Sequence, residues 1–388
     1  MAITKVTGAL LGNFAVGTNN IAIGDTALDS TNDGSPSLAI DNIAIGNAAL
    51  TANLGGASNI AVGSSALTAN TTGSNNVAIG ASALDANTTG EANTSVGKGS
   101  LSGNSTGASN TAVGKGALND NTQGNYNVAV GALSLDADTK GSTSVAVGYQ
   151  ALTAQNFTTA TDVFNTAVGY ASGLAVTTGK SNTFIGAETG KANSTGENNT
   201  FIGHEAGEAN TTASNNTAVG RDALTNNTTG EVNSAFGTSA LFTNTTGYGN
   251  TAVGKNALYT NNGNNNTAVG HEALELTSTG SDNTAVGREA LEENTTGNYN
   301  TAVGYRAADS VTTGTYNVAI GRRALDDVTT ASYNVAIGSS SLENNTAANN
   351  TAVGHNALTA NTTGAGGVAV GATAADSVTT GNYTTAIG

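Results

Sequence analysis

One 17-residue unit recurs along almost the whole chain and constrains its fold more than any other feature. A clear copy begins Asn283-Thr-Ala-Val-Gly287 and ends at Tyr299, and the next copy follows directly. The glycine that ends the apolar segment recurs 22 times, from Gly24 to Gly388; 17 of the 21 intervals are 17 residues long, two are 16, and the other two are 22 and 21. Such a strict period predicts a solenoid, in which each unit buries its apolar face against its neighbours.

We number positions within each unit from this marker glycine. Position −1 is Val, Ile or Phe in all 22 units, −2 is Ala in 19 and −4 is Asn in 19, while +3 and +4 are mostly Ala and Leu and +7 to +10 are typically Asn-Thr-Thr-Gly. The Asn, Thr, Gly and β-branched residues of these units have low helix propensity, and the units show no 3.6-residue period. The sequence therefore predicts an all-β fold, a parallel β-solenoid (β-roll) with 17-residue coils. We expect two short strands per coil, at −4 to −1 and +2 to +5, with the marker glycine and the Asn-Thr-Thr-Gly segment at corners where φ is positive.

The period also predicts the domain organisation. Residues 1–19 lie outside it and are expected to form an N-terminal cap or attachment segment, and residues 20–388 a repeat solenoid of about 22 coils. The two long intervals predict surface-loop insertions at 29–41 and 155–163. Because the last residue is itself a marker glycine, we expect the solenoid to be capped or continued in a longer parent protein.

Side-chain alternation along a strand assigns faces to the two apolar rows. The sequence leads us to expect positions −1 and −3 in the coil interior, with Val286 as an example of −1. Position −2, represented by Ala285, would then face outward. Because that row is apolar as well, it would need cover from another copy of the chain, which predicts a homo-oligomer.

Positions −2 and +4 change together. Where −2 is Phe184 or Phe201 instead of Ala, +4 of the same coil is Gly190 or Gly207 instead of Leu. Both combinations fill a similar volume, so we expect the two positions to share one packing space. Gly173 departs from this pattern, because the −2 residue of its coil is Ala.

Composition and charge exclude several classes of function. The formal charge of −15 argues against nucleic acid and anionic membranes as partners. No run of about 18 apolar residues predicts a membrane span, and the chain has no cysteine to form a disulfide or a thiolate metal site. No set of residues forms a catalytic motif outside the repeat, so we expect neither enzymatic activity nor a cofactor.

A few side chains remain as candidates for binding chemistry. His204, His271 and His355 all occupy +1, where a threefold axis would gather three copies of each into a metal site; the alternative is a solvated corner. The acid pairs Glu292-Glu293 and Asp326-Asp327 are interpreted as solvated surface instead of a cation or catalytic site.

The repeated polar residues have structural and functional interpretations as well. The −4 row, which includes Asn283, is interpreted as an amide ladder between coils instead of a ligand-binding ladder. The Asn-Thr-Thr segments at Asn70, Asn87, Asn227 and Asn294 match a glycosylation sequon but are interpreted as turns. Regular threonines at +8 and +9 leave an ice-binding array as a further alternative.

Two stretches carry a family resemblance. Ser144-Val-Ala-Val-Gly148-Tyr-Gln-Ala and Asn76-Val-Ala-Ile-Gly80-Ala-Ser-Ala resemble the head repeats of trimeric autotransporter adhesins, which are trimers of left-handed parallel β-rolls. The opening Met-Ala-Ile-Thr-Lys-Val-Thr, followed by such arrays, looks like tail-fibre proteins of bacteriophages. This resemblance implies a homotrimeric fibre shaft in the virion, attached through its N-terminus and presenting a host-receptor-binding tip that lies outside this chain. The alternatives are a bacterial cell-surface adhesin or extracellular filament, and thirdly an ice-binding solenoid.

Overall fold

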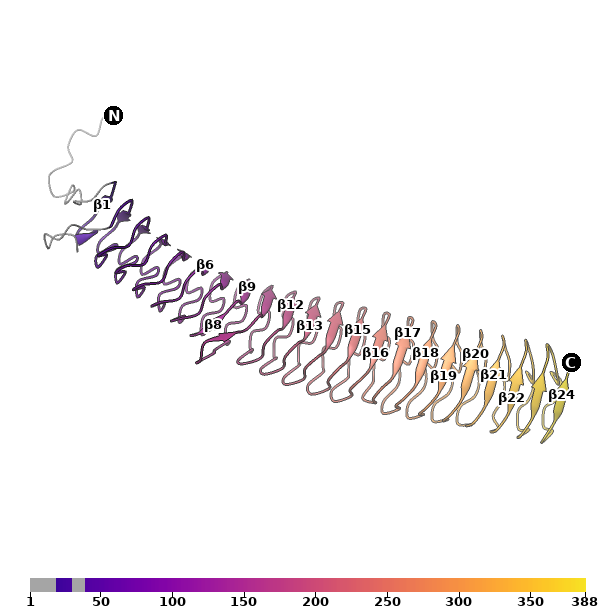
Figure 1. The fold of residues 1–388 in the computed structure, drawn as a ribbon. Coiled ribbons are helices and arrows are strands. Elements are labelled where there is room, and N and C mark those ends of the chain that lie inside the picture. Colours follow the sequence, from indigo (N-terminus) through magenta and orange to yellow (C-terminus); the bar gives the residue numbers. More distant parts are fainter. Residues whose placement is uncertain (1–18, 30–38) are drawn as a thin grey trace, which may run out of the picture. The chain divides into compact units, whose positions relative to one another are not determined.

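The chain forms a parallel β-solenoid in the computed structural model, which describes residues 19–29 and 39–388 (Figure 1). Each coil contributes one three-residue strand at positions −3 to −1, and no α-helix occurs among the described residues. Neighbouring strands pair without a shift of register, as where Ala285 pairs with Ala302 and Val286 with Val303. The predicted all-β solenoid with 17-residue coils is therefore confirmed.

The chain divides into two compact units, Met1–Thr195 and Gly196–Gly388. The main sheet of the first unit consists of β1 (Ile21–Ile23), β2 (Ile43–Ile45), β3 (Ile60–Val62), β4 (Val77–Ile79), β5 (Thr94–Val96), β6 (Thr111–Val113), β7 (Val128–Val130), β9 (Val145–Val147), β11 (Thr166–Val168) and β12 (Thr183–Ile185). The sheet of the second unit consists of β13 (Thr200–Ile202), β14 (Thr217–Val219), β15 (Ser234–Phe236), β16 (Thr251–Val253), β17 (Thr267–Val269), β18 (Thr284–Val286), β19 (Thr301–Val303), β20 (Val318–Ile320), β21 (Val335–Ile337), β22 (Thr351–Val353), β23 (Val368–Val370) and β24 (Thr385–Ile387). Within each unit the strands of the main sheet pair with one another in chain order.

The prediction of a second strand at +2 to +5 is wrong. This segment is a series of turns, because the residues at +2 and +4 both have left-handed backbone conformations, as shown by φ of 57° at Glu289 and 51° at Leu291. Left-handed backbone is costly for a residue with a side chain. Leu291 is fully buried in the interior, and its N–H donates to the carbonyl of Ala307 in the next coil at 3.0 Å, so packing and hydrogen bonding offset that cost.

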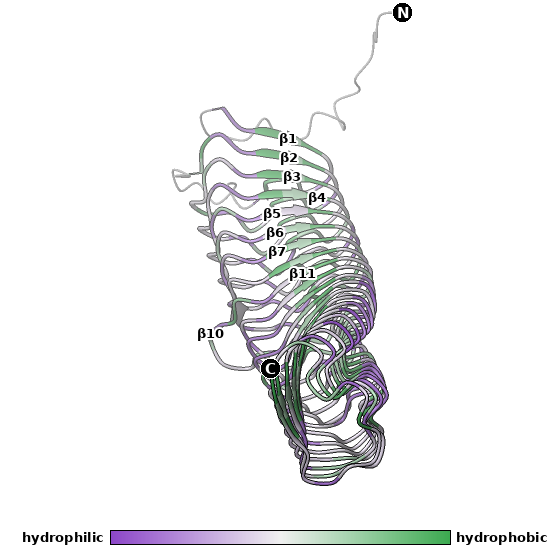
Figure 2. Cartoon of the chain, turned by 90° about the vertical axis from the view of Figure 1, so that its right-hand side faces the viewer, coloured by the Kyte–Doolittle hydropathy of each residue, from purple (hydrophilic) through white to green (hydrophobic). Residues whose placement is uncertain are grey.

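The predicted assignment of the two apolar rows is also wrong, because their faces are reversed. Ala285 is 0% exposed and lies inside the coil, whereas Val286 is 37% exposed and faces outward. The alternation itself holds, but the small alanine lies inside because the leucine at +4 and the alanine at +3, here Leu291 and Ala290, already fill the narrow interior. The inference that an outward alanine row needs a second copy to cover it therefore fails. In Figure 2 the strands β1 to β4 are hydrophobic, and each of them continues into a hydrophilic segment of the same coil.

Two positions of the repeat are usually glycine, the marker position and +10, and glycine is needed at each for a different reason. The marker glycine has positive φ, 137° at Gly287, as predicted for a corner. The glycine at +10 does not have positive φ, so the prediction for that corner is wrong. A Cβ on Gly297 would instead overlap the carbonyl oxygen of Gly314 and Oδ1 of Asn294. Glycine at +10 is therefore required by close approach between coils, not by backbone conformation.

The insertion at 155–163 is more ordered than the predicted surface loop. It contains β10 (Thr161–Asp162), which pairs in parallel with β8 (Gly141–Ser142) to form a separate small sheet. Gln155 is fully buried, where its Nε2 donates to Oδ2 of Asp138 at 2.7 Å. The insertion is therefore partly built into the coil interior. Most of the predicted cap at 1–19 and of the predicted insertion at 29–41 lies outside the described residues.

Candidate functional site

Asparagine side chains form a ladder in the coil interior that is interrupted at Ser144 and Gly367. The backbone N–H of Asn283 donates to Oδ1 of Asn266 in the preceding coil at 3.0 Å, and Oδ1 of Asn283 accepts from the N–H of Asn300 in the next coil at 2.9 Å. All three residues are buried, with exposed fractions of 0 to 1%. The −4 row therefore satisfies buried backbone groups from coil to coil, which confirms the structural interpretation of the amide ladder.

The second asparagine row, at +7, meets the first at one acceptor. The carbonyl of Gly297 accepts from Nδ2 of Asn283 at 2.8 Å and from Nδ2 of Asn294 at 3.1 Å. The asparagines of the sequon-like segments belong to this row and are fully buried: Asn70, Asn87, Asn227 and Asn294. In the folded coil their amides hold the backbone together and are not presented at the surface.

The threonines at +8 also take part in contacts between coils. The hydroxyl of Thr295 donates to the carbonyl of Thr312 at 3.0 Å, and the hydroxyl of Thr88 donates to the carbonyl of Ser105 at 2.9 Å. The threonines at +9, such as Thr296, are exposed. Only one of the two threonine rows considered for ice binding therefore points fully into solvent.

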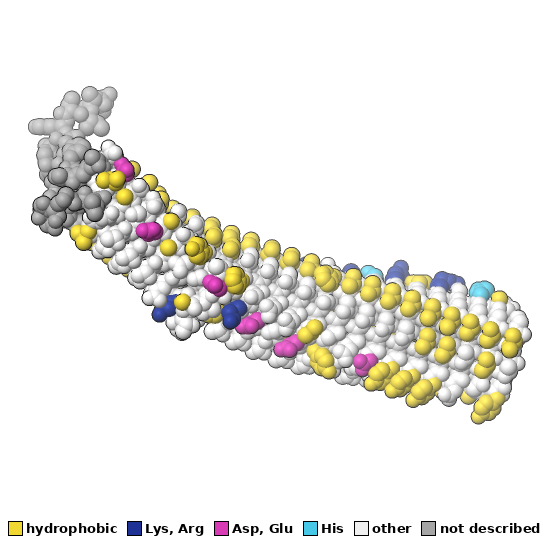
Figure 3. Space-filling view, viewed as in Figure 1, with side chains coloured by type: hydrophobic (Ala, Val, Ile, Leu, Met, Phe, Trp, Pro, Cys, Tyr) yellow, Lys and Arg dark blue, Asp and Glu magenta, His cyan; other side chains and the backbone are white. Residues whose placement is uncertain are grey.

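The outward face of the sheet carries a regular row of exposed apolar side chains. Its −1 side chains in β16 to β21 are between 37% and 39% exposed and form one straight row: Val253, Val269, Val286, Val303, Ile320 and Ile337. Figure 3 shows rows of hydrophobic side chains that run from coil to coil along the second unit. Regular apolar rows on a surface are typical of interaction sites.

The three histidines lie at exposed corners in well-separated coils. His204 and His271 place Nδ1 at 3.5 Å from Glu205 and 2.9 Å from Glu272 respectively. Nδ1 of His355 lies 3.2 Å from the carbonyl oxygen of Ser339. In Figure 3 the basic side chains of the second unit gather along the edge next to the hydrophobic row. A single chain does not bring these histidines together, although His204, Glu205 and Asp222 place one possible ligand atom each within 4.8 Å of one another.

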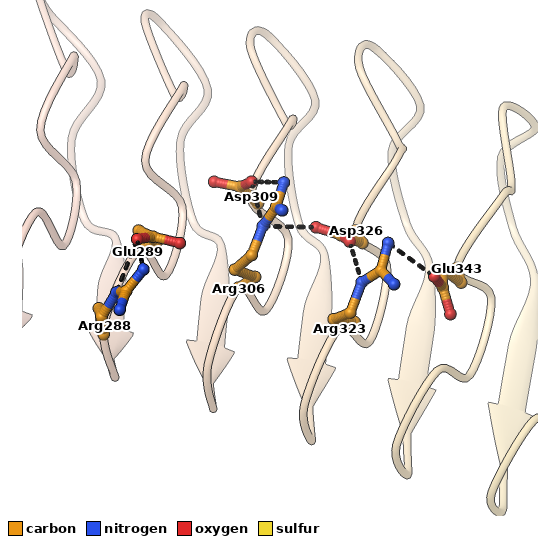
Figure 4. Close-up of polar contacts among 7 residues, drawn as sticks. All are labelled: Arg288, Glu289, Arg306, Asp309, Arg323, Asp326 and Glu343. Carbon is orange, nitrogen blue, oxygen red and sulfur yellow. Dashed lines mark hydrogen bonds and ion pairs between the residues drawn. The ribbon is translucent and has the colours of Figure 1, made fainter.

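A column of charged side chains runs along the second unit at positions +2 and +5, and sequence reasoning missed it. Nε of Arg306 donates to Oδ2 of Asp309 at 2.8 Å, and Nε of Arg323 donates to Oδ2 of Asp326 at 2.6 Å. Arg323 also reaches Glu343 in the next coil at 2.9 Å (Figure 4). Asp326 is fully buried, so its interpretation as solvated surface is wrong.

The same column is acidic in the two coils before Arg306. Glu272, Glu275 and Glu292 each place a carboxylate oxygen within 4.8 Å of the others. Burial, followed by the charges of Asp309 and the nearby glutamates, raises the pKa of Glu292 to about 7, and burial followed by the charge of Glu272 raises the pKa of Glu275. The folded-state pKa of Glu292 exceeds its ordinary value of 4.5, so folding favours the protonated form. Its contribution to stability is present at low pH and is lost as the pH rises from about 4.5 to about 7.

The first unit contains a hollow of about 340 Å³ where two successive coils have glycine at +2. Its lining includes Gly99 and Gly116, with Lys98, Lys115 and Asp136 around them. No acid, base and nucleophile converge there in a catalytic arrangement.

The part of the chain that the structure describes contains no helix long and apolar enough to cross a membrane. Comparison of the whole sequence with models of known protein families gave no match, and comparison with curated proteins also gave none.

Proposed function

We propose that this chain is the shaft of a structural fibre, most simply a bacteriophage tail fibre, and that it has no catalytic role. The observation that carries this proposal is the equivalence of the coils. Each described coil adds one strand in the same register, and the same rows of Ala, Leu and Asn continue through the interior. A repeat of this kind sets length and stiffness, because each coil contacts only its neighbours and adds the same increment.

In the proposed fibre the shaft holds the site of attachment and the site of receptor binding apart. Its N-terminal end attaches to the virion, and a tip outside this chain binds the host receptor. The resemblance to phage tail-fibre sequences supports these two roles. The interior ladders support the mechanical role, because backbone and amide hydrogen bonds link every pair of neighbouring described coils within each unit.

The proposed fibre consists of three copies that associate through the outward face of the sheet. The exposed valine and isoleucine row replaces the alanine row as the surface that needs cover. The six side chains from Val253 to Ile337 are each more than a third exposed and form one contiguous apolar row, and contiguous apolar patches of a few hundred Å² are often functional. Three copies, as opposed to two, follow the trimeric heads that the repeats resemble.

Charges placed on this face are expected to dissociate the fibre without unfolding the coils. In a triple variant with Val269→Lys, Val286→Asp and Val303→Lys, each new charge faces an opposite charge on the neighbouring strand, which limits the cost within one chain. Burying these charges between copies would be costly. We expect the mass from light scattering to fall from that of a trimer to that of a monomer, with an unchanged β-sheet circular dichroism spectrum.

A matched triple variant on the exposed +9 row provides the control. Thr279→Lys, Thr296→Asp and Thr313→Lys introduce the same charges on the same three coils, away from the valine row. This variant should keep the mass of the parent chain. A parent chain that is a stable monomer, or a loss of mass in both variants, would contradict association through the valine face.

Removal of whole coils tests the spacer role directly. Deleting 283–333 removes three units and joins Asp282 to Asn334, which occupies the same position in its coil as Asn283. The second unit should shorten by about 14 Å, one strand spacing per coil, while folding and host recognition remain intact. Electron microscopy of the fibre and a host-adsorption assay measure the two outcomes.

A deletion that is not a whole coil serves as the comparison. Removing 283–290 shifts every later row by eight positions and is expected to prevent folding of the coils around the junction. If the in-register deletion abolished host recognition while the fibre still assembled, the shaft itself would be the binding surface and the spacer role would be refuted.

A further inference from the structure

The charged column at +2 and +5 follows a rule in some coils and breaks it in others. Where the +5 residue is Asp309 or Asp326, the +2 residue of the same coil is an arginine that binds it. In the two preceding coils the +5 residues are Glu275 and Glu292, and the +2 residue is a second acid. Arg288 pairs with Glu289, the +2 acid of the second of these coils, but neither Glu275 nor Glu292 has an arginine at +2 of its own coil.

Backbone hydrogen bonds hold the acidic residues of neighbouring coils in register. The N–H of Leu276 donates to the carbonyl of Glu292, and the N–H of Glu293 donates to the carbonyl of Asp309, both at 3.0 Å. The +5 residues of three successive coils are therefore stacked at one strand spacing. Glu272 at +2 lies with Glu275 and Glu292 within 4.8 Å, and Asp309 follows Glu292 one coil further along the column.

Asp309 provides an independent sign that a ligand belongs at this place. Its side chain is 8% exposed, and its Oδ2 is bound by Arg306, whereas its Oδ1 is buried and has no hydrogen-bond partner. Figure 4 shows this second oxygen turned away from Arg306, toward the coil of Glu289, which also carries Glu292. A buried carboxylate oxygen without a partner is costly unless a cation or a donor meets it.

The available contacts leave room for a cation among these oxygens. One oxygen of Glu272 is held by His271 at 2.9 Å, and Oε1 of Glu275 accepts from Asn256 at 3.2 Å, so both side chains are oriented and each keeps a second oxygen. The carboxylate atoms of Glu272, Glu275 and Glu292 lie within 4.8 Å of one another, a separation that one bound ion can span.

We propose that Glu272, Glu275, Glu292 and Asp309 form a binding site for one Ca²⁺ ion per chain. The ion takes the place that arginine occupies in the next two coils and continues the alternation of charge along the column. Calcium suits the site because it accepts six to eight oxygen ligands in flexible geometry, so that four carboxylates and solvent complete its shell, whereas Mg²⁺ requires a strict octahedron.

Calcium titration of the full chain at pH 8, after treatment with EDTA, tests this site. At that pH the competing proton is removed from Glu292, whose pKa is about 7. Calorimetry should detect one site per chain with a Kd on the order of 10⁻⁴ M, and about 5 mM CaCl₂ should raise the Tm when an equal ionic strength of NaCl does not.

Two glutamine variants separate the site from general charge effects. Glu292→Gln should weaken calcium binding by at least about tenfold and, in EDTA at pH 8, should raise the Tm, because it removes a repelled charge without changing the shape of the side chain. Glu293→Gln removes the same charge from the exposed neighbouring residue and should bind calcium like the parent chain. Asp222→Asn probes the other acidic cluster and should also leave the binding unchanged.

The proposal fails if the parent chain binds no calcium under these conditions. It also fails if Glu292→Gln binds calcium as tightly as the parent chain, or if the binding disappears in Asp222→Asn instead, because the ion would then occupy the cluster at His204. Equal stabilisation of all variants by calcium and by NaCl would mean that the ions only screen the charge of the chain.

Discussion

Replacing the marker glycine Gly287 by alanine is expected to unfold the coil that contains it. A Cβ at this position would overlap the carbonyl oxygen of Gly304 in the next coil and lie 2.7 Å from its carbonyl carbon. The obstacle is backbone that is fixed by the strand ladder, so no side-chain rotation relieves it. Gly287 also has φ of 137°, which side-chain-bearing residues rarely adopt.

We expect Gly287→Ala to cost more than about 4 kcal/mol, because strain of the backbone conformation and overlap between coils act together. The loss should appear as a lower Tm and as faster proteolysis in the second unit, since each coil of a solenoid depends on its neighbours. Circular dichroism melting and limited proteolysis of the full chain measure both effects.

Gly99→Ala is the matched control. Gly99 has positive φ as well, 64°, but the nearest atom to an added Cβ is Oδ1 of Asn119 at 3.9 Å. Residues with side chains occupy the same +2 position in other coils, as Glu289 does with φ of 57°. This variant should change stability by less than about 1 kcal/mol. A similar loss in both variants would show that neither the φ of 137° nor the contact between coils at Gly287 accounts for the loss.

The sequence was sufficient to predict the solenoid, because a repeat of 17 residues leaves few other ways to bury an apolar row. It also predicted the asparagine ladder, since an amide that recurs at the same phase as an apolar row has to lie beside it. The phase of the alternation could not be obtained from the same pattern. Ala285 and Val286 are both apolar, and only the space left by Leu291 in the closed coil decides which one lies inside.

The turns at +2 and +4 and the charged column were missed for a related reason. Leucine is rare in left-handed backbone, so local propensity favoured a strand at +2 to +5. The backbone of this segment in fact forms a series of turns. The column did leave a signal in the sequence. Arg306 with Asp309, and Arg323 with Asp326, repeat one acid–base pair at the same two positions of successive coils. The buried state of Asp309 and its unpaired oxygen depend on stacking between coils and have no local signature.

The exchange of volume between −2 and +4 now has a direct structural basis. A Cβ on Gly190 would lie 2.6 Å from Cε1 of Phe184, and a Cβ on Gly207 would lie 2.5 Å from Cδ2 of Phe201. The phenylalanine rings therefore occupy the space that leucine fills in other coils. Gly173, which departs from the sequence pattern, fits the same rule across coils, because its Cβ would lie 2.9 Å from Cδ2 of Phe184.

Phe184→Ala should therefore open a cavity that reaches two glycines and should cost about 3–5 kcal/mol. Gly190→Leu alone should also destabilise the first unit, because its side chain would overlap the ring of Phe184. The backbone at Gly190 is already suited to leucine: its φ of 56° lies close to the 51° of Leu152 at the same position two coils earlier. Leucine is thus excluded by the ring and not by conformation.

The double variant Phe184→Ala with Gly190→Leu should regain much of the stability that either single change loses. Recovery should be incomplete, because the space beside Gly173 stays empty. We expect a coupling energy of more than about 1 kcal/mol between the two sites, measured from thermal or denaturant unfolding of the four members of the cycle. Pairing Phe184→Ala with the remote Gly99→Ala gives the comparison, in which the two effects should add. If the losses of Phe184→Ala and Gly190→Leu were additive as well, the two positions would not share one space. The coupled change of Phe and Gly along the repeat would then need another cause.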